Sequence, residues 1–367
     1  MLLAVPALSA GAAGAAGAAG AAATHDRCPE QTAIALEVGG GLLCAAVDDA
    51  VHAVRQQLLK DWMERSARIV ADYYAGFPAP LVVLRIQAAP GDGVRGGRTT
   101  NDSGLVIQVT VGRDVTAEEL AADWVLVHEM VHLALPELGR RHNWLAEGLA
   151  TYVEGIARVQ AGNRAVSDVW AEYRHSMPLG LPRAGEGGMD ETPTWGRTYW
   201  GGALYCLQAD VAMREQTGNR TGLQTSLRAI LKATGGYRSE RDIDEVLRIG
   251  DAATGTRVLE DLYSKVKATP MTPDLNGLWT RLGVPEDPKS QPFDAHAPLA
   301  AIRAAITSPT SAAPTSAAPT SERRGIAPRA LAAMLRAQLF HPKENDRTAP
   351  KAGRRITRKI SHRGKPW

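Results

Sequence analysis

Features that would settle the class of this 367-residue chain at once are missing from its sequence. Beyond the first 23 residues it has no run of eighteen strongly apolar residues, so we expect no membrane span. It has three cysteines, too few for the disulfide framework of a small secreted scaffold. Histidine is also scarce, with nine in the chain, so a close histidine pair is uncommon by chance.

The first 23 residues begin Met1-Leu2-Leu3 and continue as alanine and glycine repeats. This composition is typical of a secretion signal that ends in small residues, and it predicts an exported protein of the periplasm, cell envelope or medium. No lysine or arginine precedes Arg27, so the usual charged start of a signal is missing, and low-complexity disorder is the alternative. If the protein is exported, Cys28 and Cys44 are candidates to pair, whereas Cys206 is expected to be a buried thiol.

The other end of the chain also looks non-globular. Residues 288–322 are rich in Pro, Ser, Thr and Ala and predict a linker, which leaves residues 24–287 for a folded domain. Residues 323–367 contain thirteen Lys or Arg and two acids, a net charge of +11. Because the whole chain has a formal net charge of +3, residues 1–322 carry about −8. Such a tail can contact anionic surfaces, or it is a solvated tail without a partner. We predict no specific nucleic-acid partner.

The segment His128-Glu129-Met130-Val131-His132 has the spacing of a metal site. Two histidines four residues apart lie on one face of an α-helix, so both rings can reach one zinc ion. Glu129 then lies beside the ion, where its carboxylate can act as a general base without being a ligand. A capping box at Thr116 and Glu119, followed by apolar residues at helical spacing up to Pro136, predicts one continuous helix for this segment.

A candidate third ligand follows after a short polar connection. Asn143 is a typical N-cap for a helix over residues 144–159, and Glu147 lies near the start of that helix. Two helices joined by a short loop pack antiparallel, which can bring Glu147 to the two histidines. Three protein ligands leave the fourth zinc position for water, as in catalytic sites. Thr151, one turn on, is a candidate to hold Glu147; the alternative for Glu147 is an exposed glutamate at a helix start.

These residues carry a family resemblance over about residues 80–285. His128-Glu129-x-x-His132, Trp144-Leu145-Ala146-Glu147-Gly148 and Tyr199-Trp200-Gly201-Gly202 together resemble the gluzincin peptidases, especially the aminopeptidase N and glycyl aminopeptidase families (peptidase MA-like). The resemblance implies one zinc ion per chain with His128, His132 and Glu147 as ligands, Glu129 as the base, and Tyr199 as the donor to the oxyanion. It also implies an α+β, thermolysin-like catalytic domain, with a small β-sheet packed on a mainly helical lobe and zinc between them.

Some assignments remain open within this resemblance. Tyr205, Tyr173 and His175 are rivals of Tyr199, and Tyr152 is a weaker one because it points about 140° around the helix from Glu147. Metzincins are excluded, because Leu135 and Leu138 occupy the positions of their glycine and third histidine.

One departure bears on the type of peptidase. The strand that corresponds to the amine-binding strand of aminopeptidases is expected at residues 102–109, and it contains no glutamate. Selection for a free N-terminal amine is therefore not supported, which favours an endopeptidase or a non-standard aminopeptidase. Alternating Leu105, Ile107 and Val109 can form a sheet edge to which a peptide substrate adds, or simply a core strand.

The rest of the folded region is predicted from its periodicity. A helix is expected over residues 48–74, strands over 81–86 and 104–111, and a cleft-bordering loop over 161–197. Further helices are expected at 199–215, 223–232, 242–248, 257–267 and 275–282.

Zinc-dependent hydrolysis of a peptide or protein substrate is the function that these patterns favour. One alternative is an exported binding protein that keeps the fold without turnover, but the intact Glu129 argues against it. The other is a zinc hydrolase that acts on a non-peptide amide or ester.

Overall fold

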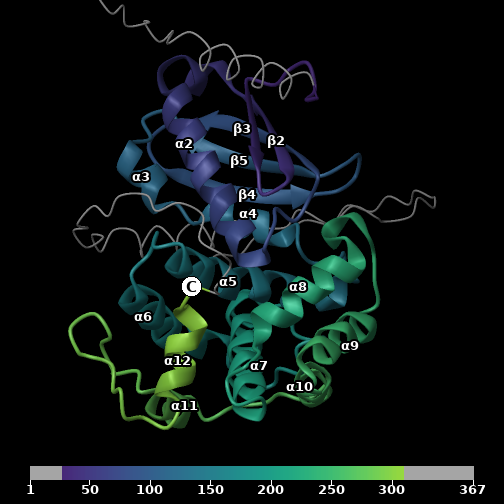
Figure 1. The fold of residues 1–367 in the computed structure, drawn as a ribbon, viewed down its shortest axis with the longest axis vertical. Coiled ribbons are helices and arrows are strands. Elements are labelled where there is room, and N and C mark those ends of the chain that lie inside the picture. Colours follow the sequence, from purple (N-terminus) through teal and green to yellow (C-terminus); the bar gives the residue numbers. More distant parts are fainter. Residues whose placement is uncertain (1–26, 310–367) are drawn as a thin grey trace, which may run out of the picture. The chain divides into compact units, whose positions relative to one another are not determined.

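The computed structural model describes residues 27–309, without the side chains of residues 52–54 (Figure 1). The predicted signal at 1–23, the basic tail at 323–367 and the later part of the predicted linker lie outside the described residues. Within residues 27–309, none of the helices combines the length and apolarity that crossing a bilayer requires.

A mixed sheet of five strands forms the first part of the described chain. The strands are β1 (Ile34–Val38), β2 (Gly41–Val47), β3 (Leu81–Ala89), β4 (Val94–Thr100) and β5 (Val106–Gly112), in the order β1-β2-β3-β5-β4. The central strands β2, β3 and β5 run parallel, and β1 and β4 pair antiparallel at the two edges. The sheet is the small one that the sequence predicts, but only β3 and β5 were recognisable from periodicity.

Residues 105–109 do not form an edge of the sheet, which was one of the two alternatives from the sequence. Strand β5 lies inside the sheet, and Leu105, Ile107 and Val109 are buried core residues. The edge strand next to β5 is β4, whose sequence Val-Arg-Gly-Gly-Arg-Thr-Thr has no alternation of apolar and polar residues. Glycine weakens a strand but lets another backbone or side chain approach closely, which becomes important at the site below.

Helix α2 (Asp49–Tyr74) packs along the sheet, as Figure 1 shows. It begins at Asp48, whose carboxylate accepts a hydrogen bond from the Ala50 amide, in agreement with the helix predicted over 48–74. Its buried face, which includes Leu59, Trp62 and Met63, belongs to the same apolar core as the sheet residues. Burying such side chains contributes about 1.5–3 kcal/mol each.

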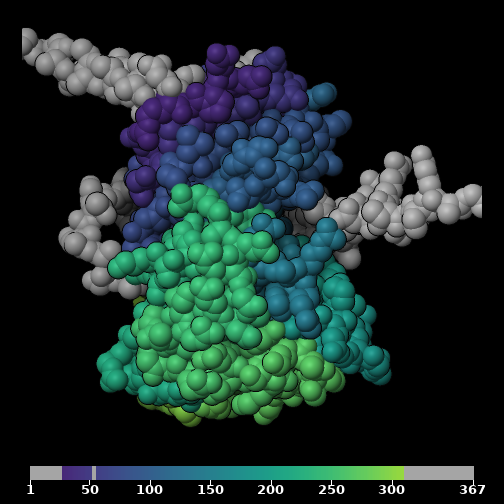
Figure 2. Space-filling model, turned by 90° about the vertical axis from the view of Figure 1, so that its right-hand side faces the viewer, coloured from purple at the N-terminus to yellow at the C-terminus, as the bar shows by residue number. Residues whose placement is uncertain are grey.

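The later helices form the second layer, below the sheet in Figure 1. In Figure 2 the green surface of the helices after residue 200 lies directly against the purple and blue surface of the first part of the described chain. They are α5 (Asn143–Gln160), α6 (Val166–Ser176), α7 (Gly202–Gln216), α8 (Leu223–Thr234), α9 (Ile243–Thr254), α10 (Val258–Val266), α11 (Leu275–Leu282) and α12 (Ala300–Thr307). The four helices expected between residues 223 and 282 are present as α8 to α11.

Two of these helices correct the sequence-based expectations. Residues 161–197 are not one loop, because α6 lies within them with Val169, Trp170 and Tyr173 fully buried. The surrounding Gly, Pro and Arg residues hid this short apolar face from a periodicity search. Helix α12 lies within the stretch predicted as linker, and its Ile302 and Ile306 are buried against the domain, so the folded residues extend past 287.

All three cysteines lie within the described residues. Cys28 and Cys44 form a disulfide that ties the start of the described chain to β2. Cys206 is a buried free thiol in α7, and burial raises its pKa.

Candidate metal centre

The two histidines lie on α4 (Val125–His132), a short helix that starts at a defined break. The continuous helix predicted from Thr116 is wrong: the capping box belongs to α3 (Ala117–Ala122), and the chain is extended at Asp123. The Asp123 carboxylate accepts hydrogen bonds from the amides of Val125 and Leu126 and from Trp62 Nε1 of α2. The apolar spacing continues across this break, so the sequence pattern could not reveal it.

Helix α5 brings the third candidate ligand. Asn143 is its first residue and not its N-cap, because the preceding 3₁₀ turn Arg140–His142 leads directly into the helix. Thr151 donates to the backbone carbonyl of Glu147 at 2.8 Å, so it does not hold the carboxylate as expected. Helices α4 and α5 pack against each other, with α4 under the edge strand β4 (Figure 1).

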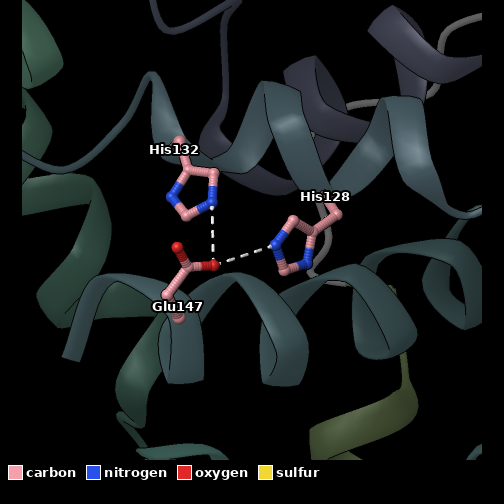
Figure 3. A group of neighbouring side chains, drawn as sticks. All are labelled: His128, His132 and Glu147. Atoms are coloured by element: carbon pink, nitrogen blue, oxygen red, sulfur yellow. Dashed lines mark ion pairs between the residues drawn. The ribbon is translucent and has the colours of Figure 1, made fainter. Parts of the chain in front are cut away.

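The side chains of His128, His132 and Glu147 converge between these helices (Figure 3). Glu147 Oε2 lies 3.4 Å from His128 Nε2 and 3.5 Å from His132 Nε2, and all three ligand atoms are within 4.8 Å of one another. Ligands about 2.0–2.2 Å from a tetrahedral zinc ion are roughly 3.3–3.6 Å apart, so both histidine–glutamate separations match such a site. Two imidazoles and one carboxylate are also a donor set that zinc accepts.

The three side chains are largely enclosed and influence one another's charge. Burial raises the pKa of Glu147, but hydrogen bonds and charge from His128 and His132 outweigh it and hold that pKa well below its usual range. Burial lowers the pKa of His132, and the larger combined effect of Glu147 and Glu129 raises it. His128 Nδ1 is buried and has no acceptor among the described residues. The ionised Glu147 is thus the form that can bind a cation.

Glu129 is held from the other side by the edge strand. Its side chain is buried, and Thr99 Oγ1 lies 2.7 Å from Glu129 Oε2 and 2.9 Å from the Glu129 backbone oxygen, so its single proton serves both acceptors. Gly97, on the same face of β4, leaves room for Glu129, because a Cβ there would lie 2.5 Å from Glu129 Cγ. Sequence reasoning missed both residues, since nothing in a Gly-Gly-Arg-Thr run signals proximity to residue 129.

Tyr199 lies in a π-helical turn, Arg197–Gly201, directly before α7. Its ring stacks near that of His128, with centroids 6.4 Å apart. Burial, then the charges of Glu147 and Glu129 and a hydrogen bond with Glu147, raise the pKa of Tyr199, so its phenol keeps its proton near neutral pH. Helix α5 and the start of α7 can approach this closely only because both have glycine at the contact. A Cβ on Gly148 of α5 would lie 2.2 Å from Gly202 Cα.

The rivals of Tyr199 lie elsewhere. The buried hydroxyl groups of Tyr173 and Tyr205 donate to backbone carbonyls, of Tyr152 and Leu259 respectively. The Tyr152 hydroxyl donates to Asp210 at 3.0 Å, and His175 is exposed on α6. Among the candidates from the sequence, Tyr199 is therefore the one that the fold brings next to the histidine and glutamate cluster.

Comparisons with solved structures agree with this type of fold. An aminopeptidase N family protein from Idiomarina loihiensis superimposes with a TM-score of 0.52 at 12% identity, over 68% of this chain and 49% of that one. An M1 zinc metallopeptidase from Deinococcus radiodurans gives a TM-score of 0.44 at 15% identity, over 66% and 52%. The chain thus spans about half the length of these proteins. No family model and no curated protein matches it.

The likeness to the Idiomarina protein concerns the fold alone. The shared fold is helix-rich with a small mixed sheet, which agrees with the α+β fold class predicted from the sequence. Independently of that likeness, the described residues of this chain include a cluster of two histidines and one glutamate that can bind a metal ion.

Proposed function

We propose that this protein hydrolyses peptide bonds with one zinc ion per chain, held by His128, His132 and Glu147. The observation that carries the proposal is the convergence of these three side chains at separations that suit tetrahedral zinc, with a buried carboxylate next to one of them. A structural histidine pair would not need a third, ionised ligand from another helix.

The proposed chemistry assigns a task to each neighbouring group. When bound, zinc acts as a Lewis acid that polarises the scissile carbonyl and makes water nucleophilic near neutral pH. Glu129 takes a proton from the attacking water and passes it to the leaving amine. Thr99 keeps the Glu129 carboxylate in one orientation during this transfer. Tyr199 donates its phenolic proton in a hydrogen bond to the carbonyl oxygen as negative charge develops there.

The edge strand supports an endopeptidase or a non-standard aminopeptidase. Strand β4 packs against the zinc-ligand helix more extensively than β5 does, and it too contains no acid that would hold a substrate's free amine. Within the described sheet, β4 pairs with β5 on one side only, so an extended peptide can add to its other side by backbone hydrogen bonds.

We also propose that the protein is exported. The disulfide between Cys28 and Cys44 supports this, because disulfides persist in oxidising compartments and are rare in the reducing cytosol. Thiol labelling of unfolded protein taken from its native compartment should modify Cys206 alone. Labelling of all three cysteines would contradict the proposal.

The test of the function combines zinc analysis with a peptide-library digest, with and without chelator. One equivalent of zinc and chelator-sensitive internal cuts are expected for an endopeptidase, whereas cuts limited to the first residue would indicate an aminopeptidase. Zinc without cleavage of any peptide would contradict peptide hydrolysis. It would leave either the binding role or hydrolysis of another amide or ester.

A further inference from the structure

A small cavity lies beside the π-helical turn that carries Tyr199. Its volume is about 130 Å³, enough for a small side chain or terminal group, and its wall includes Leu179, Arg183, Glu186, Trp195 and Arg197. These residues come from the 3₁₀ turn Met177–Gly180, from the irregular segment that follows it and from the start of the π turn. The stretch is part of the region that the sequence predicts to border the cleft.

Arg197 is the unusual group in this wall. Arg197 is only 4% exposed, yet no carboxylate of the described residues forms an ion pair with it. A guanidinium has five N–H donors. Within residues 27–309 the Arg197 guanidinium forms one hydrogen bond, from Nη1 to the Gly180 carbonyl at 2.8 Å, and its enclosed Nε has no acceptor. Burying a cation without an anion is unfavourable, so this site favours an anionic partner.

The other charged groups at the cavity do not supply that partner. Arg183 is exposed, and Glu186 accepts a hydrogen bond from the Arg183 backbone amide at 2.9 Å. Burial lowers the pKa of Arg197, and the charge of Glu186 raises it without forming an ion pair. Trp195 Nε1 is a second enclosed donor in the same wall that has no acceptor among the described residues.

The cavity lies within substrate reach of the candidate zinc site. The Trp195 ring centroid is 6.1 Å from that of Tyr199, and Tyr199 is 6.4 Å from His128. An extended peptide advances about 3.3–3.6 Å per residue, so a group within about four residues of the scissile bond can reach this wall.

From this geometry we propose that the cavity is a substrate subsite that binds a carboxylate of the peptide through Arg197. The inference rests on the proposed peptidase function and adds a substrate preference that the proposed function leaves unspecified. The carboxylate belongs either to an acidic side chain or to the peptide's C-terminus, because both present the same planar pair of oxygens to a guanidinium.

Matched peptide pairs test the preference. Quenched fluorescent peptides carry Glu or Gln at each position within four residues of the scissile bond, and a second set ends in a free carboxylate or an amide. We expect one acidic form to be cut with a kcat/KM about 10- to 100-fold above its neutral partner. Arg197→Gln should bring that ratio close to one while the neutral peptides are still cut. A ratio near one in the wild type, or one unchanged by the substitution, would overturn the proposal.

The controls separate a specificity role from a structural one. Arg197 also joins the π turn to Gly180, so loss of that bond alone would lower cleavage of acidic and neutral peptides alike. Arg174→Gln removes a comparable bond, from Nη1 to the Val284 carbonyl at 3.2 Å, away from the cavity, and should leave the ratio as in the wild type. If Arg197→Gln does not fold, Leu179→Glu places an anion in the wall at a residue 37% exposed and should lower the same ratio. Leu179→Gln should not.

A binding measurement distinguishes failure of this subsite from failure of the peptidase proposal. The same peptide pairs are titrated by calorimetry into the full chain carrying Glu129→Gln, with and without Arg197→Gln. Tighter binding of the acidic peptide, by about tenfold and only when Arg197 is present, supports the subsite even if the wild type cuts no peptide. Equal binding of both peptides would refute the subsite even if the wild type is an active peptidase.

Discussion

The helix pair that carries the candidate zinc ligands and the walls that surround it are built in different ways. His128, His132 and Glu147 come from residues 128–147, and two adjacent helices bring them together. The walls come from β4, thirty residues upstream of Glu129, and from the turn at Arg197–Gly201. Local spacing therefore determines what the site can bind, whereas long-range packing determines how its base and its donors are oriented.

The strongest test of this comparison is the base itself. Glu129→Gln leaves the three ligands in place and removes the group that accepts a proton. We expect zinc content to be unchanged and kcat to fall by about two to four orders of magnitude. Elemental analysis and peptide hydrolysis measure the two quantities. Near-normal turnover would show that another group is the base.

Tyr199→Phe probes the wall formed by the π turn. The phenyl ring keeps the stacking against His128, but the hydrogen bond to the developing oxyanion is lost. The activation free energy should therefore rise by about 2–4 kcal/mol, and kcat should fall accordingly. Substrate binding should change little. Single-turnover kinetics separate the two effects. An unaltered chemical step would remove Tyr199 from the proposed mechanism.

Gly97→Ala probes the wall formed by β4. The new methyl group would lie 2.5 Å from Glu129 Cγ and must displace it, and a displacement of about 1 Å can cost roughly a hundredfold in rate. Arg98→Ala on the opposite face of the same strand is the matched control and should keep kcat and zinc. If both variants behave alike, the close approach of β4 has no role in placing the base.

Thr99→Val should have the smallest effect. It keeps the shape of the side chain but removes the hydroxyl that serves two oxygens of Glu129, a loss of about 1 kcal/mol or roughly fivefold in kcat. Thr99→Ser keeps the hydroxyl and should restore most of the rate. Equal rates for the Val and Ser variants would exclude Thr99 as a positioning residue.

The sequence predicted the parts of the molecule that depend on local spacing. The histidine pair, Glu147, the helix over residues 48–74 and the four later helices follow from periodicity and capping. It did not predict the break at Asp123, because the apolar pattern runs on across it. It also missed β4 and its contact with Glu129, since two glycines carry no strand signal and a packing distance leaves no trace in the chain.

The measurement that tests the central claim most directly is zinc affinity, determined by chelator competition for the wild type, Glu147→Ala and Glu137→Ala. Glu137 is an exposed glutamate between the two helices and serves as the control. We predict one tightly bound zinc ion in the wild type and in Glu137→Ala, and an affinity lower by roughly a hundredfold or more in Glu147→Ala. Equal affinity in all three proteins would contradict a site built from His128, His132 and Glu147.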